Sequence, residues 1–154
     1  MNKVLLAVDD TKGADRAAET LINFCSEIKP VYVVLVYVEK MLGRSLLGEA
    51  LANGPEMDEM RIALKDTDYQ QMLDKKAVKI ITYYTKILND AGITAIKPVV
   101  KEGHPSDEIL GTAKEEDAEL IVIGSRGDRS HDFLIGSVSR EVANTSPIPV
   151  LLAR

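Results

Sequence analysis

Short apolar runs alternate along the chain with stretches in which apolar residues recur every three or four positions. The run at 3–9 contains Val-Leu-Leu-Ala-Val, and the run at 31–38 is rich in β-branched and aromatic residues. The first is typical of a strand that is buried on both faces, and the second is the strongest strand signal in the chain. Between them, 14–28 has apolar residues at helical spacing, and Pro30 ends that helix. The first quarter of the chain therefore predicts a strand, a helix and a second strand.

A long helix is predicted before Gly92, because aromatic and aliphatic residues there share one helical stripe and the glycine supplies a C-terminal stop. The strand predicted at 94–100 contains Pro98. Proline has no N–H group to donate to a neighbouring strand, so this strand is expected at an edge of the sheet.

The last third of the chain continues the alternation. Pro105 begins a helix that is expected to run to about residue 117, with acidic residues in its first turn, where the helix dipole favours them. A strand at 120–123, a glycine-rich loop, a helix at 137–145 and a strand at 150–152 follow. Five strands joined by crossover helices predict an α/β fold: a single domain over 1–154, with an open, mostly parallel sheet and helices on both of its faces.

Residues 40–66 interrupt this pattern, because they combine glycines, a proline, methionines and mixed charge. We interpret them as an excursion with a short helix rather than as a second domain. Their methionine and leucine content suits an adaptable apolar contact, which leaves open a lid over a ligand or a partner surface. We favour packing against this chain's own domain or dimer.

Composition narrows the function classes. The chain has 154 residues, 45% of them hydrophobic and 28% charged, and a net charge of -5. These values are ordinary for a globular domain, and the acidic surface disfavours duplex nucleic acid as the main partner. Cys25 is the single cysteine, which excludes an intramolecular disulfide and a cysteine-based zinc cluster. There is no signal-peptide pattern and no apolar run of roughly 20 residues, so a cytoplasmic protein is expected.

Candidate chemistry is expected at the carboxyl ends of the strands, where ligands bind in open α/β sheets if the strand order reverses. Two segments lie there: the turn after the first strand, with Asp9, and the loop 124–139. Glycines in the loop let backbone N–H groups approach an anion, and the helix start at Ser137 adds free N–H groups and partial positive charge. Arg126 and Arg129 are further donors. A tight turn and a capped helix without any ligand would use the same residues, so residue chemistry alone favours neither interpretation.

Five segments carry a resemblance. They are VLLAVD at 4–9, EGHPSDEIL at 102–110, DAELIVIGSRG at 117–127, GSVS at 136–139 and SPIPVLL at 146–152. Together they are similar to the universal stress protein family over nearly the whole chain. The resemblance implies a sheet of strand order 3-2-1-4-5, as in adenine nucleotide alpha hydrolase-like folds, and a homodimer. In that order the apolar strand 150–152 is an edge, which invites pairing with a second copy.

For one branch of this family, the resemblance also implies ATP held between strands 1 and 4, with Mg²⁺ only through the nucleotide. The residues carried over at the adenosine end are Ala7, Val8, Asp9, Tyr37, Val38, Ile123 and Gly124. Those carried over at the phosphates are Gly127, Gly136, Ser137, Val138 and Ser139, to which Arg126 and Arg129 add positive charge. Two other roles stay open: Asp9 as a cap on the next helix, and Tyr37 as strand packing.

The loop departs from the ATP-binding pattern of the family. That pattern has nine residues between its second and third glycines, whereas eight separate Gly127 from Gly136, and Asp128 and Asp132 are among them. A second branch of the family binds no ATP. The favoured hypothesis is a dimeric stress-response switch that binds ATP or AMP, and the alternative is a nucleotide-free dimeric adaptor of the same fold.

Other chemistries fit less well. Asp9 and Asp10 after an apolar strand also resemble a response-regulator receiver, but 50–57 offers no third strand that ends in a phosphoacceptor aspartate. Cys25 lies on the apolar stripe of its helix, which favours a core residue over a nucleophile. The two histidines, His104 and His131, form no metal-ligand motif. The sequence therefore favours a binding protein without catalytic residues of its own, with at most slow ATP hydrolysis and no metal site in the protein.

Overall fold

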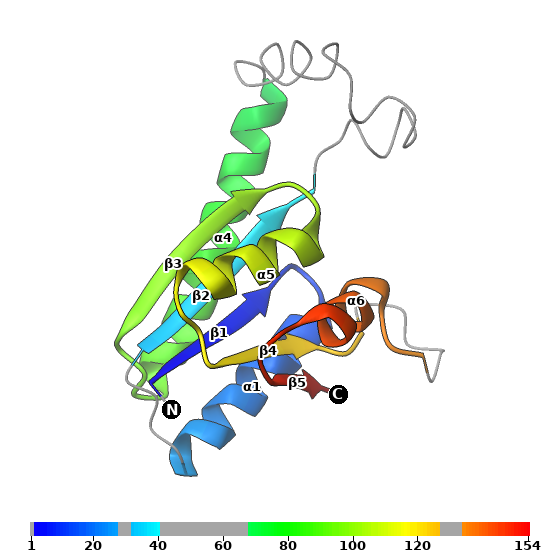
Figure 1. Cartoon of the computed structure of the whole chain (residues 1–154). Coiled ribbons are helices and arrows are strands. Elements are labelled where there is room, and N and C mark those ends of the chain that lie inside the picture. The colour runs from blue at the N-terminus through cyan, green and yellow to red at the C-terminus, as the bar shows by residue number, and fades with distance from the viewer. Residues whose placement is uncertain (1, 28–31, 41–67, 127–133) are drawn as a thin grey trace.

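A central parallel sheet organises the structure, a computed structural model that describes residues 2–27, 32–40, 68–126 and 134–154. The described strands have the order β3-β2-β1-β4-β5, as predicted, and every neighbouring pair is parallel (Figure 1). Their bounds are β1 Lys3–Val8, β2 Tyr32–Glu39, β3 Ile96–Glu102, β4 Leu120–Gly124 and β5 Val150–Ala153.

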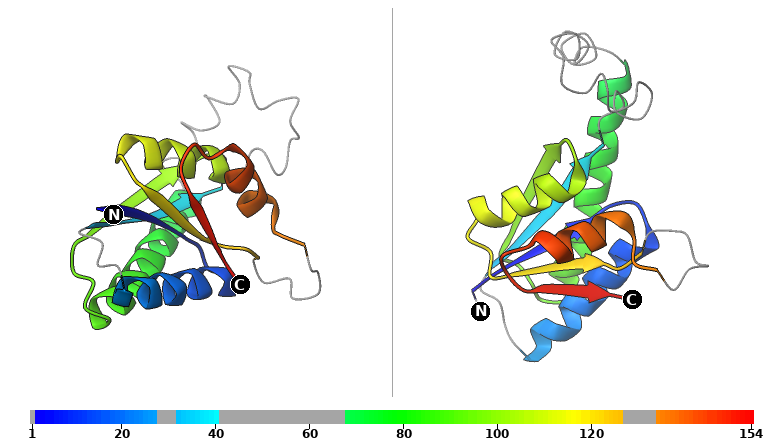
Figure 2. Two further views of the ribbon diagram at one scale, coloured as in Figure 1. Left: turned by 60° about the horizontal axis from the view of Figure 1, so that its bottom comes forward. Right: turned by 45° about the vertical axis from the view of Figure 1, so that its right-hand side comes forward.

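Helices cover both faces of the sheet. On one face lie α1 (Lys12–Glu27) and α4 (Asp68–Asp90), and on the other lie α5 (Pro105–Glu115) and α6 (Ser137–Thr145) (Figure 2). Within the described residues the predicted strands and helices are present, with shifted ends. The helix predicted at 14–28 begins two residues earlier, and the strand predicted at 94–100 runs from Ile96 to Glu102. The predicted excursion at 40–66 lies outside the described residues except for Lys40.

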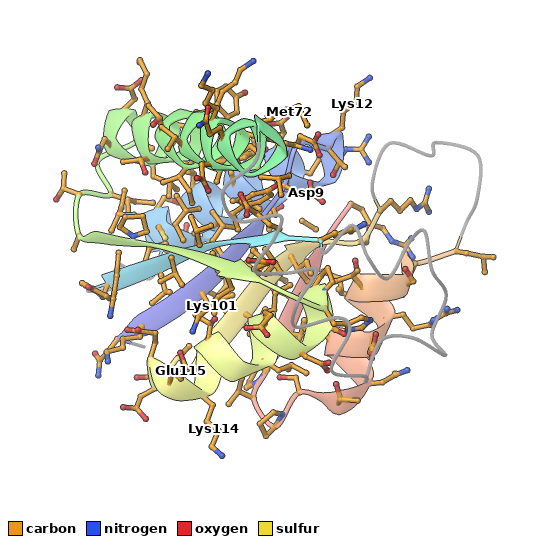
Figure 3. The ribbon with its side chains drawn as sticks, turned by 90° about the horizontal axis from the view of Figure 1, so that it is seen from above. Asp9, Lys12, Met72, Lys101, Lys114 and Glu115 are labelled. Carbon is orange, nitrogen blue, oxygen red and sulfur yellow. The ribbon has the colours of Figure 1, made fainter. Side chains whose placement is uncertain are left out.

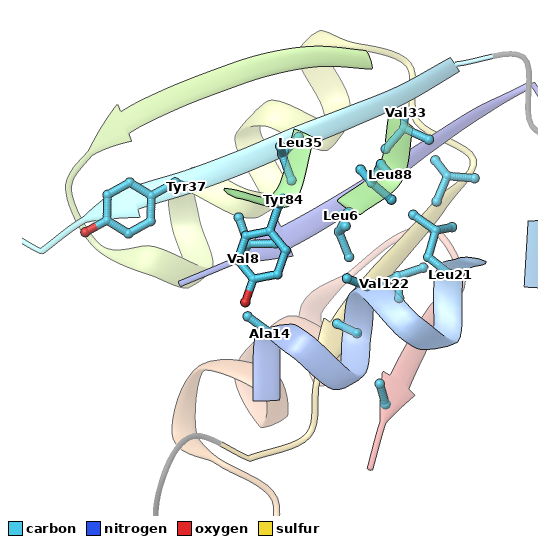
Figure 4. Packing of buried hydrophobic residues seen from close by; sticks show 14 of the residues in the cluster. Leu6, Val8, Ala14, Leu21, Val33, Leu35, Tyr37, Tyr84, Leu88 and Val122 are labelled. Atoms are coloured by element: carbon cyan, nitrogen blue, oxygen red, sulfur yellow. The ribbon is translucent and has the colours of Figure 1, made fainter. Parts of the chain in front are cut away.

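Two apolar cores hold these layers together, one on each face of the sheet. Side chains of a strand alternate between the faces, so Leu6 packs toward α1 and α4 while its neighbour Leu5 packs toward α5 and α6. Figure 4 shows the first core, in which Leu6, Leu21 and Leu88 are fully buried. Each such leucine contributes about 1.5–3 kcal/mol by leaving water. Cys25 is also buried in this core, which agrees with its predicted packing role.

Edge strand β3 carries features that oppose further pairing. Ala95 accepts a hydrogen bond from β2 and Gly103 donates one to β2, so the odd-numbered residues of β3 face β2 and Pro98 faces outward. The missing N–H group of Pro98 therefore lies on the free edge, as its sequence position predicted. On the α5 face, Lys97 and Lys101 form ion pairs with Glu116 and Glu115 at the C-terminal end of α5, and lysines at an edge also oppose strand addition.

The strand order reverses between β1 and β4. From β1 the chain passes to α1 on one face, and from β4 it passes to α6 on the other face (Figure 2). The two connections therefore diverge at the carboxyl ends of these neighbouring strands. This is the position at which open α/β sheets bind ligands.

Candidate functional site

The turn after β1 forms one side of this position. Asp9 Oδ1 accepts hydrogen bonds from the Thr11 backbone N–H, at 2.8 Å, and from the Thr11 hydroxyl, at 2.6 Å. These bonds hold the chain in the turn that leads into α1, so Asp9 has a structural role of the capping kind left open above. Its side chain is exposed beside α1 and α4 (Figure 3), where it can still accept a hydrogen bond from a ligand hydroxyl.

A backbone contact between α1 and β4 forms the base of the site. A Cβ atom added at Gly124 would lie 2.3 Å from the Gly13 carbonyl oxygen, and one added at Gly13 would lie 1.7 Å from the Arg126 carbonyl oxygen. No side chain fits at either distance. Neither glycine has a positive φ, so glycine is needed here for the close approach rather than for backbone freedom. Gly124, predicted as a ligand contact, thus has a packing reason of its own, and the packing role of Gly13 was missed.

The start of α6 forms the other side. The Gly136 N–H donates to the Ser125 carbonyl at 2.7 Å, and the Ser139 hydroxyl donates to the Gly124 carbonyl at 2.6 Å. Gly136 is the N-cap of α6 and has no side chain with which to cap the helix amides. The N-terminus of α6 therefore offers backbone N–H groups and a partial positive charge beside the end of β4. Because the Ser139 hydroxyl proton is donated to Gly124, this side chain connects α6 to the end of β4.

The structure brings most of the predicted residues to one end of the sheet but buries several of their side chains. Ala7 and Val8 lie in opposite cores, and Ile123 lies in the core beneath α5 and α6. Only their backbone can line a ligand site. Gly127 and Arg129 lie outside the described residues, whereas Arg126, Ser137 and Val138 belong to the described flanks of the loop.

The end of β2 presents two residues of opposite orientation. Tyr37 packs in the core with α1 and α4 and is 5% exposed, while Val38 packs toward α5 (Figure 4 labels Tyr37). Burial raises the pKa of the Tyr37 hydroxyl. The strand-packing role left open for Tyr37 therefore accounts for its ring.

Lys76 and Glu39, which the sequence analysis did not identify, lie next to this strand end. Lys76 of α4 forms an ion pair with Asp10 at 2.8 Å, and the hydrogen bond from Lys76 lowers the pKa of that carboxyl. Glu39, at the end of β2, is 4% exposed, and its Oε1 has no hydrogen-bond partner among the described residues. Burial, and then the charges of Asp74 and Glu102, raise the pKa of Glu39. No motif marks these residues, because they meet only when α4 packs beside β2.

Comparison with known proteins identifies the family. The model of the universal stress protein family matches residues 1–154. The chain belongs to this family. The universal stress protein YxiE of Bacillus subtilis is 31% identical over 157 residues, which cover 99% of each chain.

Solved structures of universal stress proteins share the fold. The structure of MJ0577 superposes with a TM-score of 0.72 at 22% identity, covering 99% of this chain and 94% of that one. A universal stress protein in complex with cAMP has a TM-score of 0.67 at 19% identity and covers 99% and 97%. The Archaeoglobus fulgidus protein in complex with dAMP has a TM-score of 0.63 at 22% identity and covers 100% and 98%.

None of the helices in the described ranges is long and apolar enough to cross a membrane.

The Gly13–Gly124 contact yields a stability prediction. Gly124→Ala would place a methyl group against the α1 backbone, so we expect the free energy of unfolding to fall by about 1–3 kcal/mol or more. The control is Gly111→Ala in α5, where an added Cβ meets nothing within 4 Å. There the same change should be neutral or stabilise by about 0.5–1 kcal/mol. Urea denaturation measures both, and equal effects would show that the contact is not tight.

Glu39 yields a pH prediction. Its pKa is raised in the folded state, so the folded protein loses stability as pH rises through that pKa and Glu39 ionises. Glu39→Gln removes this charge and should unfold at a higher temperature than the parent at neutral pH. The difference should shrink as pH falls toward the ordinary glutamate value, where both proteins are neutral at this position. The exposed Glu115→Gln is the control, and thermal melts at pH 4 to 8 provide the readout; a difference independent of pH would contradict the prediction.

Proposed function

We propose that this universal stress protein binds an adenine nucleotide, ATP or AMP, at the carboxyl ends of β1 and β4 and acts as a dimeric stress-response switch. The observation that carries the proposal is the N-terminus of α6. Its N-cap, Gly136, brings no side chain, and hydrogen bonds hold it beside the end of β4. A helix N-terminus in this setting favours an anion such as a phosphate.

The phosphates would lie on the α6 side. The backbone N–H groups of Ser137 and Val138 and the Ser137 hydroxyl are the donors expected there, with Gly127 allowing a close approach of the loop. Arg126 and Arg129 would add positive charge, and Mg²⁺ would enter bound to the phosphates of the nucleotide. Ser139 would act indirectly, since its hydroxyl donates to the Gly124 carbonyl.

The nucleoside would lie on the β1 and β2 side. Asp9 would accept a hydrogen bond from a ribose hydroxyl while Thr11 holds the carboxylate in place. The backbone at the carboxyl ends of β1 and β4 would contact the nucleoside, and the end of β2 at Val38 would flank the base. Relatives of the same fold in complex with cAMP and dAMP support an adenine nucleotide as the ligand class.

A specific feature favours the second candidate function, a nucleotide-free adaptor. The loop between Gly127 and Gly136 is one residue shorter than the ATP-binding pattern and contains Asp128 and Asp132. Both features would weaken a triphosphate site, because carboxylates repel phosphates.

One experiment separates these functions. The purified protein is denatured with acid, the supernatant is chromatographed for adenine nucleotides, and ATP and AMP are titrated calorimetrically into the nucleotide-free protein. Near-stoichiometric nucleotide, or saturable binding, supports the switch. An empty extract together with no heat of binding at millimolar ATP and Mg²⁺ would leave the adaptor function.

A pair of variants at Gly136 tests the phosphate position. Its φ of -59° and ψ of 155° suit any N-cap residue, and an added Cβ would make only ordinary contact, 3.5 Å from the Ser125 oxygen. Gly136→Asp would cap α6 with a negative charge and should lower ATP affinity at least about tenfold, because an anion then occupies the helix N-terminus.

The matched control is Gly136→Asn, which has the same shape and caps the helix without the charge. It should retain more affinity than the aspartate variant, and both should keep the stability of the parent or exceed it. Equal ATP affinity in the parent and the aspartate variant would place the phosphates elsewhere.

The dimer is proposed to form through the outer edge of β5. The carbonyls of Pro149 and Ala153 accept hydrogen bonds from β4, so by alternation the backbone groups of Val150 and Leu152 face outward. Unlike β3, this strand has no proline or lysine within it. An unprotected apolar edge favours pairing with a second copy.

Leu152→Pro tests this edge by reproducing the protection that Pro98 gives to β3. It removes an outward N–H group and leaves the bonds to β4, so we expect a monomer in light scattering after size-exclusion chromatography. The control, Leu152→Val, should remain a dimer. A folded proline variant that is still dimeric would exclude β5 as the interface.

A further inference from the structure

Three side chains that can ligate a metal ion meet between the start of α5 and the second turn of α6. His104 is the N-cap of α5, Asp107 lies in the first turn of α5, and Glu141 lies in the second turn of α6. His104 Nδ1 is 3.6 Å from Asp107 Oδ2, and His104 Nε2 is 3.9 Å from Glu141 Oε2. One ligand atom from each residue lies within 4.8 Å of those of the other two.

The histidine is held by a residue outside this trio. The Ser106 hydroxyl shares a hydrogen bond of 2.9 Å with His104 Nδ1, and Ser106 is fully buried. A histidine that ligates a metal usually has its second ring nitrogen held in this way, which fixes the orientation of the ring. With Nδ1 held by Ser106, Nε2 is the nitrogen left for a metal ion.

The electrostatics favour a cation at this place. Among the described residues, the ion pairs of Asp107 and Glu141 involve His104 and no lysine or arginine. Two carboxylates therefore face one imidazole. The N-terminus of α5 opposes a cation with about half an elementary positive charge, which two full negative charges outweigh.

We propose that His104, Asp107 and Glu141 form a surface site for a divalent transition-metal ion of the Zn²⁺, Co²⁺ or Ni²⁺ class. One imidazole nitrogen and two carboxylate oxygens suit these ions better than Ca²⁺ or Mg²⁺, which prefer oxygen ligands throughout. Three protein ligands leave the remaining positions to water, so the site is open. The bound ion would join α5 to α6.

Cobalt provides the direct test, because its visible absorption reports coordination by the protein. Untagged, nucleotide-free protein is titrated with CoCl₂, and thermal melts are recorded with CoCl₂ and ZnCl₂. We expect a saturable visible band with one ion per chain. The melting temperature should rise by roughly 5–10 °C when the metal is at about one hundred times its dissociation constant.

Variants locate the ion. His104→Gln and Glu141→Gln should each abolish the band or weaken cobalt binding more than tenfold, while both variants melt like the metal-free parent. Ser106→Ala should weaken binding about 10–100-fold through loss of ring orientation. His131→Gln, which changes the other histidine of the chain, is the control and should bind as the parent does.

Two results would overturn the site. The first is no spectral change and no thermal shift at a metal concentration of about 1 mM, roughly the weakest affinity that a specific site would show. The second is metal binding that depends on His131 and not on His104. Neither result bears on the nucleotide proposal, which is tested without transition metals.

Discussion

The structure depends on the contact between two backbones at Gly13 and Gly124. There the first turn of α1 lies directly against the end of β4, at distances that leave no room for a Cβ atom on either residue. The contact determines how closely the two sides of the switch point approach each other. A wider separation would move the β1 turn away from the start of α6, and one small ligand would no longer reach both.

The end of β4 is also where the other elements of the site are joined. Ser125 donates its N–H to Ala153 of β5 and accepts from Gly136 of α6, while Gly124 accepts from Ser139. Two consecutive residues thus connect α1, α6 and β5. A ligand held at the proposed site would touch this junction, and the proposed dimer edge begins one hydrogen bond away from it. The proposed ligand site and the proposed dimer edge are therefore neighbours, so coupling between them needs no long path through the core.

The two edges of the sheet differ in chemistry. Strand β3 turns Pro98 outward and carries lysines paired with α5, whereas β5 is apolar along its length. Because unpaired backbone groups bind a further strand unless something prevents it, the proposed dimer uses β5 rather than β3.

The sequence alone determined much of this molecule. Apolar runs and helical stripes predicted the order of the elements, Pro98 located an edge, and the family motifs implied the strand order, because each of these signals is local in the chain. Local signals could not decide between the alternatives for Asp9 and Tyr37, or the direction in which the Ser139 hydroxyl donates. Gly13, Glu39 and Lys76 carried no motif, and nothing in the sequence linked His104 to Glu141, since the residues that Gly13, Lys76 and Glu141 contact are distant in the chain. Tertiary structure gave Asp9 and Tyr37 structural roles and fixed the other contacts, because the role of a side chain depends on which atoms the packing of helices on the sheet brings within a few ångströms of it.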